Sequence, residues 1–180
     1  KNMEIVSTKL LEKTGGKSFF FEKIPKDLKV AVIVSSDSTA KGTRSDKSGR
    51  IIEERLKTQG IAPEYIVLPD DAPKIKAKME EFIQQGVKLI ITTGGTGLGP
   101  RDVTVEATRE VIDREIPGIM EAARSFGQRR TPYAMLSRGL AGQKGGTIIV
   151  NLPGSSRGAE ESLDAIFPAV LHAYRMMKGT

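Results

Sequence analysis

The sequence of 180 residues contains no cysteine and no tryptophan, and it holds a single histidine. Without cysteine the chain has no disulfide framework and no thiolate metal site. No apolar run approaches the roughly 20 residues that a helix needs to cross a bilayer. The opening residues, Lys-Asn-Met-Glu, also lack the apolar core of a secretory signal. These absences favour a cytoplasmic protein with no membrane partner.

Aromatic residues are scarce as well, at 5% of the chain, and the three tyrosines are scattered. The net charge of +6 divides evenly, because residues 1–29 contribute +3 (seven lysines, four acids) and residues 30–180 contribute +3 (21 basic, 18 acidic). A nucleic-acid surface usually needs a basic stripe with stacking aromatics. We therefore expect no nucleic-acid partner, and a phosphorylated small molecule suits this charge better.

Short apolar runs alternate with amphipathic segments along the chain. The run 29–36, Lys-Val-Ala-Val-Ile-Val-Ser-Ser, is typical of a parallel strand covered on both faces. Strands are expected over 29–36, 61–68, 87–92 and 147–151, with a short one near 138–141. Helices are expected over 48–58, 73–85, 104–130 with an interruption at Pro117-Gly118, and from after 155 to about 178. This alternation predicts a three-layer α/β/α sandwich with a mostly parallel central sheet.

The polar loops of this chain all follow predicted strands. They cover residues 35–47, 69–71, 93–102 and 151–156. In open parallel sheets the ligand crevice lies beyond the carboxyl ends of the strands. This coincidence predicts an enzyme or a ligand-binding protein.

The loop from Thr92 to Asp102 reads Thr-Thr-Gly-Gly-Thr-Gly-Leu-Gly-Pro-Arg-Asp. Its glycines allow positive φ angles that turn backbone N–H groups toward an anion. It is not a P-loop, because no Gly-Lys-Ser/Thr follows at the required spacing, and its glycines do not match the dinucleotide fingerprint. A plain turn between a strand and a helix is the alternative.

Asp102 and the pair Asp70-Asp71 each stand just before a predicted helix, so each is also a candidate N-cap. Both acidic positions follow strands of the same predicted sheet. Mg²⁺ binds one or two carboxylates and completes its shell with water and phosphate oxygens. Asp70 and Asp102 are therefore candidate Mg²⁺ ligands as well as candidate helix caps.

The segment Leu152–Ser156 precedes the last helix and offers N–H groups that bind anions. Ser155 or Ser156 is the expected N-cap of that helix. The single histidine, His172, lies among apolar residues of the same helix. We interpret it as a helix-face residue rather than a catalytic base.

Four motifs in order resemble the molybdopterin adenylyltransferase family, which shares its signature with a domain of gephyrin. The main one is Thr92–Gly97 followed by Arg-Asp-Val-Thr at 101–104. The others are Ser-Ser-Asp at 35–37 with Asp-Lys-Ser-Gly at 46–49, Leu-Pro-Asp-Asp at 68–71, and Asn-Leu-Pro-Gly at 151–154. The resemblance covers residues 29 to about 178.

The resemblance implies a homotrimer and a reaction in which ATP and Mg²⁺ activate the phosphate of molybdopterin as an AMP adduct, with release of pyrophosphate. A partner enzyme then inserts molybdate. Asp70 and Asp102 match the catalytic acids of the family. The remaining matches are Gly94, Gly95, Thr96 and Gly97 in the substrate loop, and Ser35, Asp37, Ser137, Arg138, Pro153, Gly154 and Ser155 at the pocket rim. A non-catalytic molybdopterin-binding paralogue or scaffold is the alternative.

Residues 9–18, Lys-Leu-Leu-Glu-Lys-Thr-Gly-Gly-Lys-Ser, resemble the closing segment of cyclic pyranopterin monophosphate synthases. The resemblance implies that residues 1–28 are the remnant of an upstream fused enzyme or a linker. Residues 29–180 then form the molybdopterin-binding domain. The joint is expected at Pro25–Leu28.

A chain that starts near Lys26 should therefore keep the melting temperature, the oligomeric state and the adenylyl transfer of the full chain. Differential scanning calorimetry, light scattering and an adenylylation assay would check this expectation. Unfolding or loss of turnover after the truncation would show that the first residues belong to the domain.

Overall fold

The computed structural model describes residues 8–10, 19–21 and 28–178. Its main sheet has six strands in the order β4-β3-β5-β8-β7-β6. The strands are β3 (Val30–Ser35), β4 (Glu64–Leu68), β5 (Leu89–Thr93), β6 (Arg114–Glu115), β7 (Ala141–Lys144) and β8 (Thr147–Leu152). The first four strands of that order are parallel, and β7 runs antiparallel to both of its neighbours, β8 and β6.

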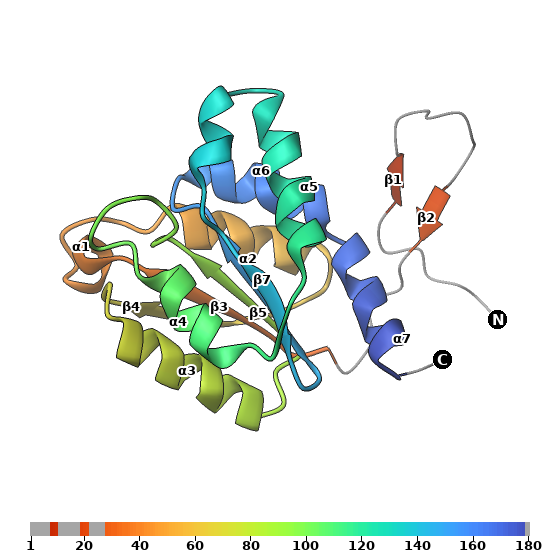
Figure 1. Ribbon diagram of the computed structural model, residues 1–180, viewed down its shortest axis with the longest axis horizontal. Coiled ribbons are helices and arrows are strands. Elements are labelled where there is room, and N and C mark those ends of the chain that lie inside the picture. Colours follow the sequence, from red (N-terminus) through yellow and green to blue (C-terminus); the bar gives the residue numbers. More distant parts are fainter. Residues whose placement is uncertain (1–7, 11–18, 22–27, 179–180) are drawn as a thin grey trace.

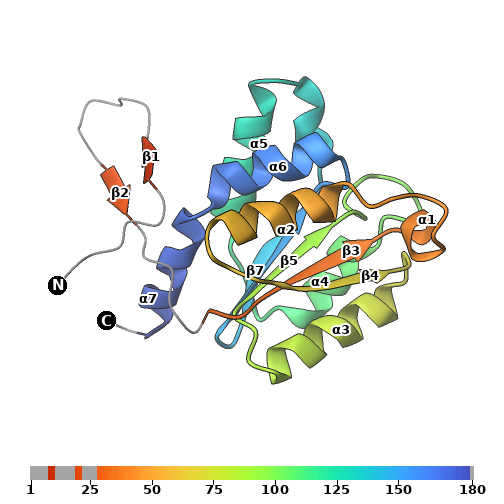
Figure 2. The ribbon, with the colours of Figure 1, turned by 180° about the vertical axis from the view of Figure 1, so that it is seen from behind.

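The helices cover both faces of this sheet. They are α1 (Asp37–Ala40), α2 (Ser48–Thr58), α3 (Ala72–Gln84), α4 (Thr104–Val111), α5 (Pro117–Gln128), α6 (Ser156–Ile166) and α7 (Ala173–Lys178), with 3₁₀ turns η1 (Pro132–Leu136) and η2 (Ala169–His172). Helices α3 and α4 lie on one face, and α2, α5 and α6 lie on the other (Figure 1, Figure 2). The predicted three-layer α/β/α class is confirmed.

The central strands are apolar along their whole length because both faces are covered. In β3, Ala31 and Ile33 contribute to the core under α3 and α4. Its alternate residues, Val30, Val32 and Val34, contribute to the core under α2, α5 and α6. A strand with two buried faces cannot alternate polar and apolar residues. The continuous β-branched run in the sequence is therefore the direct consequence of the layer structure.

Several predicted boundaries need correction. The short strand expected near 138–141 lies instead at Ala141–Lys144, and the strand expected from 61 begins at Glu64. The last helix is broken into α6, η2 and α7, because Pro168 has no N–H to continue the helical bonding. The sequence patterns also missed α1, η1 and β6, which have five residues or fewer.

Two strands precede the main sheet. β1 (Thr8–Leu10) pairs antiparallel with β2 (Phe19–Phe21) in a separate two-stranded sheet. The rest of the expected upstream remnant, apart from residue 28, lies outside the described residues. Among the described helices, none is long and apolar enough to cross a membrane.

A buried polar residue fixes the centre of the sheet behind the glycine loop. Asn151 in β8 is fully buried. Its Nδ2 donates to the hydroxyls of Thr92 in β5, at 3.0 Å, and Thr108 in α4, at 2.9 Å. Its Oδ1 accepts from the backbone N–H of Leu140 at 3.3 Å. Because these groups satisfy one another inside the core, they hold β5, β8 and α4 in one arrangement.

Candidate functional site

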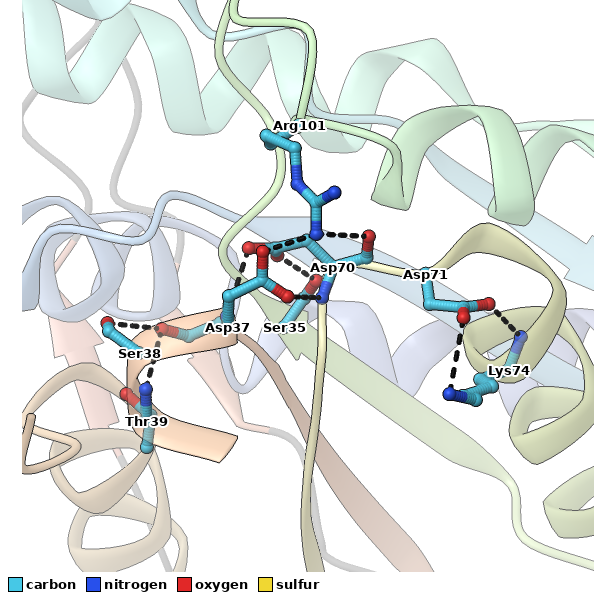
Figure 3. Close-up of polar contacts among 9 residues, drawn as sticks. Ser35, Asp37, Ser38, Thr39, Asp70, Asp71, Lys74 and Arg101 are labelled. Atoms are coloured by element: carbon cyan, nitrogen blue, oxygen red, sulfur yellow. Dashed lines mark hydrogen bonds and ion pairs between the residues drawn. The ribbon is translucent and has the colours of Figure 1, made fainter. Parts of the chain in front are cut away.

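The loops that follow β3 and β4 are joined by two aspartates at the carboxyl edge of the sheet (Figure 3). The backbone N–H of Asp37 donates to Oδ2 of Asp70 at 3.1 Å, and the backbone N–H of Asp70 donates to Oδ1 of Asp37, also at 3.1 Å. Ser35 donates its hydroxyl to Oδ1 of Asp70 at 2.7 Å. We call this reciprocal arrangement of Asp37 and Asp70 the aspartate clasp.

Arg101, from the glycine-rich loop after β5, joins the clasp. Its Nη2 donates to Oδ2 of Asp37 and lies 3.4 Å from the carbonyl oxygen of Asp70. The pKa of Asp37 is lowered, first by the N–H of Asp70 and then by Arg101, which outweigh the opposing effect of burial. The carboxylate of Asp37 is therefore charged at neutral pH, and Figure 3 shows it between Asp70 and Arg101.

The three candidate capping aspartates have different roles. Asp71 is the N-cap of α3, since its side chain accepts from the N–H of Lys74 at 3.1 Å. Asp70 does not cap this helix and belongs to the clasp instead. Asp102 does not cap α4, whose N-cap is Val103 without a side-chain bond; Oδ2 of Asp102 accepts from the N–H of Gly99 at 2.8 Å. The capping interpretation is confirmed for Asp71 and is wrong for Asp102.

The expected Mg²⁺ ligands, Asp70 and Asp102, lie in separate hydrogen-bond groups. Asp70 interacts with Ser35 and Asp37, whereas Asp102 closes its own loop through Gly99. Across 28–178 and the two short described strands, no three His, Cys, Asp or Glu side chains gather closely enough to form a metal site by themselves. A metal here would need further oxygen ligands from water or substrate.

The glycine loop approaches its neighbours too closely for side chains. Gly94 has φ 93°, and a Cβ on it would lie 2.2 Å from the carbonyl oxygen of Ser35. Gly95 has φ 65°, and its Cβ would lie 2.2 Å from the hydroxyl oxygen of Thr104. A Cβ on Gly154, after β8, would lie 3.1 Å from the Cα of Gly94. These glycines allow the loops after β3, β5 and β8 to touch.

Arg138 holds the other side of the glycine loop. Its backbone N–H donates to the carbonyl of Thr96 at 2.9 Å. Its guanidinium donates from Nε to the carbonyl of Gly97 at 2.6 Å and from Nη2 to the carbonyl of Asp102 at 2.7 Å. The guanidinium also pairs with Glu106 of α4. The structure thus places Arg138 against the glycine loop.

A polar cavity of about 510 Å³ opens beside the clasp. Four predicted site residues line it: Ser35, Gly94, Gly154 and Ser155. Arg44, Lys47 and Ser48 also line it, although the sequence analysis did not assign them to the site. The sequence signals for these residues were the Asp-Lys-Ser-Gly motif at 46–49 for Lys47 and Ser48, and the polar composition of residues 37–47 for Arg44. The N-termini of α2 and α6 also lie at the wall of this cavity, and the free N–H groups of a helix N-terminus favour the binding of anions.

The N-terminus of α2 is held in place from behind. Oδ1 of Asp46 accepts from the N–H of Gly49 at 3.0 Å, and Tyr65 donates its hydroxyl to the same carboxylate. Burial, and then the hydrogen bond to Asp46, raise the pKa of Tyr65 far above its ordinary value. The hydroxyl therefore remains a donor. It fixes the segment that carries Arg44 and Lys47.

A second cavity, of about 300 Å³, has one lining residue, Ser155, in common with the first. Three predicted site residues line it, namely Ser137, Pro153 and Ser155. Ser155 is also the N-cap of α6, because its hydroxyl accepts from the N–H of Gly158 at 3.2 Å. The predicted residues therefore divide between two adjoining cavities, the clasp and the glycine loop. His172 lies in η2 and lines neither cavity.

Gly94→Ala should destabilise the protein more than Gly86→Ala. Both glycines have positive φ, 93° and 79°, but nothing lies within 4 Å of a Cβ at Gly86. The shared backbone strain costs about 1–2 kcal/mol. Collision with the carbonyl of Ser35 should add roughly 1–3 kcal/mol at Gly94. Urea unfolding of both variants measures the difference, and equal losses would contradict the close approach of the two loops.

Comparisons with known proteins agree with this architecture. Residues 31–172 match the family described as "Probable molybdopterin binding domain". A molybdopterin adenylyltransferase of Helicobacter pylori strain J99 is 34% identical, over 83% of this chain and 88% of that protein. The structure of the molybdopterin biosynthesis enzyme MoaB from Thermus thermophilus superposes with a TM-score of 0.79 and 44% identity, over 85% of this chain and 98% of that one.

A longer relative matches nearly the whole chain. The molybdenum cofactor biosynthesis bifunctional protein of Chlorobaculum tepidum is 43% identical over 99% of this chain, which spans 57% of that protein. The match thus includes the described strands β1 and β2 as well as the main sheet. The family predicted from the four motifs is confirmed, and the chain belongs to the molybdopterin-binding domain family of molybdenum cofactor biosynthesis.

Proposed function

We propose that the chain transfers AMP from ATP to the terminal phosphate of molybdopterin, with Mg²⁺, and releases pyrophosphate. The observation that carries this proposal is the polar cavity beside the aspartate clasp, bounded by the glycine loop and two helix N-termini. Relatives named molybdopterin adenylyltransferase, at 34–35% identity over most of the chain, support the same reaction.

The reaction needs no covalent nucleophile from the protein. A phosphate oxygen of molybdopterin attacks the α-phosphorus of ATP, the bond to the bridging α,β-oxygen breaks, and pyrophosphate leaves. The task of the protein is to position two anions and to offset their charge. Arg44, Lys47 and the N–H groups of α2 and α6 supply positive charge at the cavity wall, where Asp46 is bonded to Gly49 and Tyr65. The hydroxyls of Ser35 and Ser155 line the same space.

The carboxylates of Asp70 and Asp102 suit Mg²⁺, which prefers oxygen ligands and keeps several waters. Both follow strands of the same sheet, and Asp70 is oriented by hydrogen bonds from Ser35 and Asp37. When bound, the metal would offset charge that develops on the phosphates. Asp70 and Asp102 would hold it.

Asp70→Asn and Asp102→Asn should each sharply reduce adenylyl transfer while leaving the fold nearly intact. Asparagine keeps the shape and an acceptor oxygen but removes the charge that offsets the metal or stabilises the transition state, which costs roughly 3–4 kcal/mol in barrier height. Formation of adenylylated pterin from molybdopterin, ATP and Mg²⁺ measures the loss. Asp71→Asn is the matched control, because asparagine caps α3 equally well.

An Asp70 or Asp102 variant that turns over like the parent would remove that residue from the catalytic assignment. Molybdopterin binding without any adenylylated product from the unmodified chain would instead favour a binding paralogue or scaffold. Binding alone does not separate the two functions, so the product must be detected directly.

We further propose that the protein works as a cytosolic homotrimer that passes its product to a molybdate-inserting enzyme. Three large apolar side chains on η1 support self-association, since Tyr133, Met135 and Leu136 are 75%, 62% and 50% exposed. Apolar side chains clustered at a surface often mark an interface.

Light scattering at micromolar concentration should give three times the chain mass of 19.5 kDa. Replacing Met135 and Leu136 with serine should lower that mass if η1 lies in the interface. The control is Met176→Ser on α7, where a single side chain is 71% exposed. A stable monomer of the unmodified chain would contradict the trimer.

A further inference from the structure

The glycine-rich loop, residues 94–103, is anchored unequally on its two sides. On the side of β7, Arg138 binds three loop carbonyls at 2.6–2.9 Å and pairs with Glu106. On the side of β4, Arg101 reaches from the loop to the aspartate clasp. The bonds from the backbone and side chain of Arg138 are difficult to break together, whereas the two contacts of Arg101, made through a single nitrogen, are easier to break.

The Arg101 contact is open to solvent. Its side chain is 66% exposed, and that of Asp37 is 30% exposed. Ion pairs with this exposure contribute little to stability, because water and salt screen them. The contacts to Asp37 and Asp70 both use the same nitrogen, Nη2, of a group that has five N–H donors. Arg101 is thus held loosely and keeps geometric capacity for another anion.

Arg101 stands where a nucleotide phosphate would encounter negative charge. It contacts Asp37 and the backbone of Asp70, which lie at the ends of β3 and β4 (Figure 3). Ser36 and Thr39, on either side of Asp37, line the polar cavity. A triphosphate near these carboxylates is repelled unless a cation lies between them. A planar guanidinium binds phosphate oxygens in bidentate fashion, which suits this role.

We propose that Arg101 is a phosphate-binding residue for the nucleoside triphosphate. Asp37 holds its guanidinium while the site is empty, and the guanidinium exchanges this carboxylate for a phosphate oxygen when the nucleotide binds. The inference rests on the proposed function only in taking a nucleoside triphosphate as the substrate. Asp37 is then a competitor for the arginine, and its removal should favour the nucleotide.

The test is a double-mutant cycle on nucleotide binding. Isothermal titration calorimetry of the full chain with α,β-methylene ATP, at fixed Mg²⁺, measures affinity without turnover. Arg101→Gln should weaken binding about tenfold or more, the range of a lost charge-assisted hydrogen bond. Asp37→Asn should tighten binding several-fold, because asparagine can still accept from the N–H of Asp70 but no longer holds the arginine by charge. In the Arg101→Gln background most of that gain should disappear.

Two further variants separate phosphate binding from loop structure. Arg101→Lys keeps the positive charge but loses the planar guanidinium that binds phosphate through two N–H groups. Its affinity for the analogue should therefore fall between those of the parent and Arg101→Gln. Arg109→Gln is the matched control for net charge, because Arg109 is 63% exposed and pairs with Glu115 at 3.4 Å outside the site. Its affinity should stay within about twofold of the parent, since long-range surface charge is screened.

The outcomes are distinct. If Arg101 only ties two loops together, Arg101→Gln and Asp37→Asn should weaken binding equally, and the double variant should add nothing; that result would overturn the proposal. An equal gain from Asp37→Asn in both backgrounds, or no binding of the analogue to the unmodified chain, would also overturn it. If the unmodified chain forms adenylylated pterin but Arg101→Gln leaves its affinity for the nucleotide analogue unchanged, this inference is refuted and the proposed reaction is not. If the mutant cycle gives the expected affinities but the unmodified chain forms no adenylylated pterin, the proposed reaction is refuted and Arg101 remains a nucleotide-binding residue.

Discussion

The parallel pairing of β4, β3, β5 and β8 is the constraint on which the site depends. Parallel strands bring all of their carboxyl ends to one edge, so the segments after Ser35, Leu68, Thr93 and Leu152 have to meet there. The pairing itself is stabilised by burial, since the apolar side chains of the central strands are covered by helices on both faces. Groups that are far apart in sequence therefore come into hydrogen-bond contact, such as the hydroxyl of Thr93 and the backbone carbonyl of Pro153, 60 positions apart.

Glycine decides how closely these segments meet. At Gly94 the backbone touches the carbonyl of Ser35, and Gly154 lies against Gly94, so three loops share a space that side chains would fill. The buried Asn151 network fixes Thr92, just before this point, from inside the core. The loop thus rests on a rigid base, and the N–H groups of Gly94 and Gly99 are already bonded to the carbonyl of Leu152 and to Asp102.

The sequence predicted the fold well where burial and helix ends leave a strong pattern. The apolar run of β3 and the glycines after α2 and α3 placed those elements within one or two residues. Three short elements, α1, η1 and β6, were missed, because α1 and β6 are too short to show a period. For the site, the sequence predicted the loops at the carboxyl edge of the sheet, but it did not predict how their side chains pair. Asp70 lies with Asp37 rather than with Asp102, a contact that depends on strand order and not on any local pattern.

The two sides of the glycine loop are therefore held by hydrogen bonds and ion pairs of different strength, and this difference bears on function. Arg138 and the buried network keep one side of the glycine loop fixed. The clasp side depends on Arg101, an exposed cation facing charged oxygen atoms, where each contact is weak and easily exchanged. A nucleotidyl transferase must hold its two substrates in line while it binds one anion and releases another. For the proposed reaction, a fixed wall opposite an exchangeable cation would meet both requirements, because the Arg138 side would keep the geometry while charge is rearranged on the exposed side.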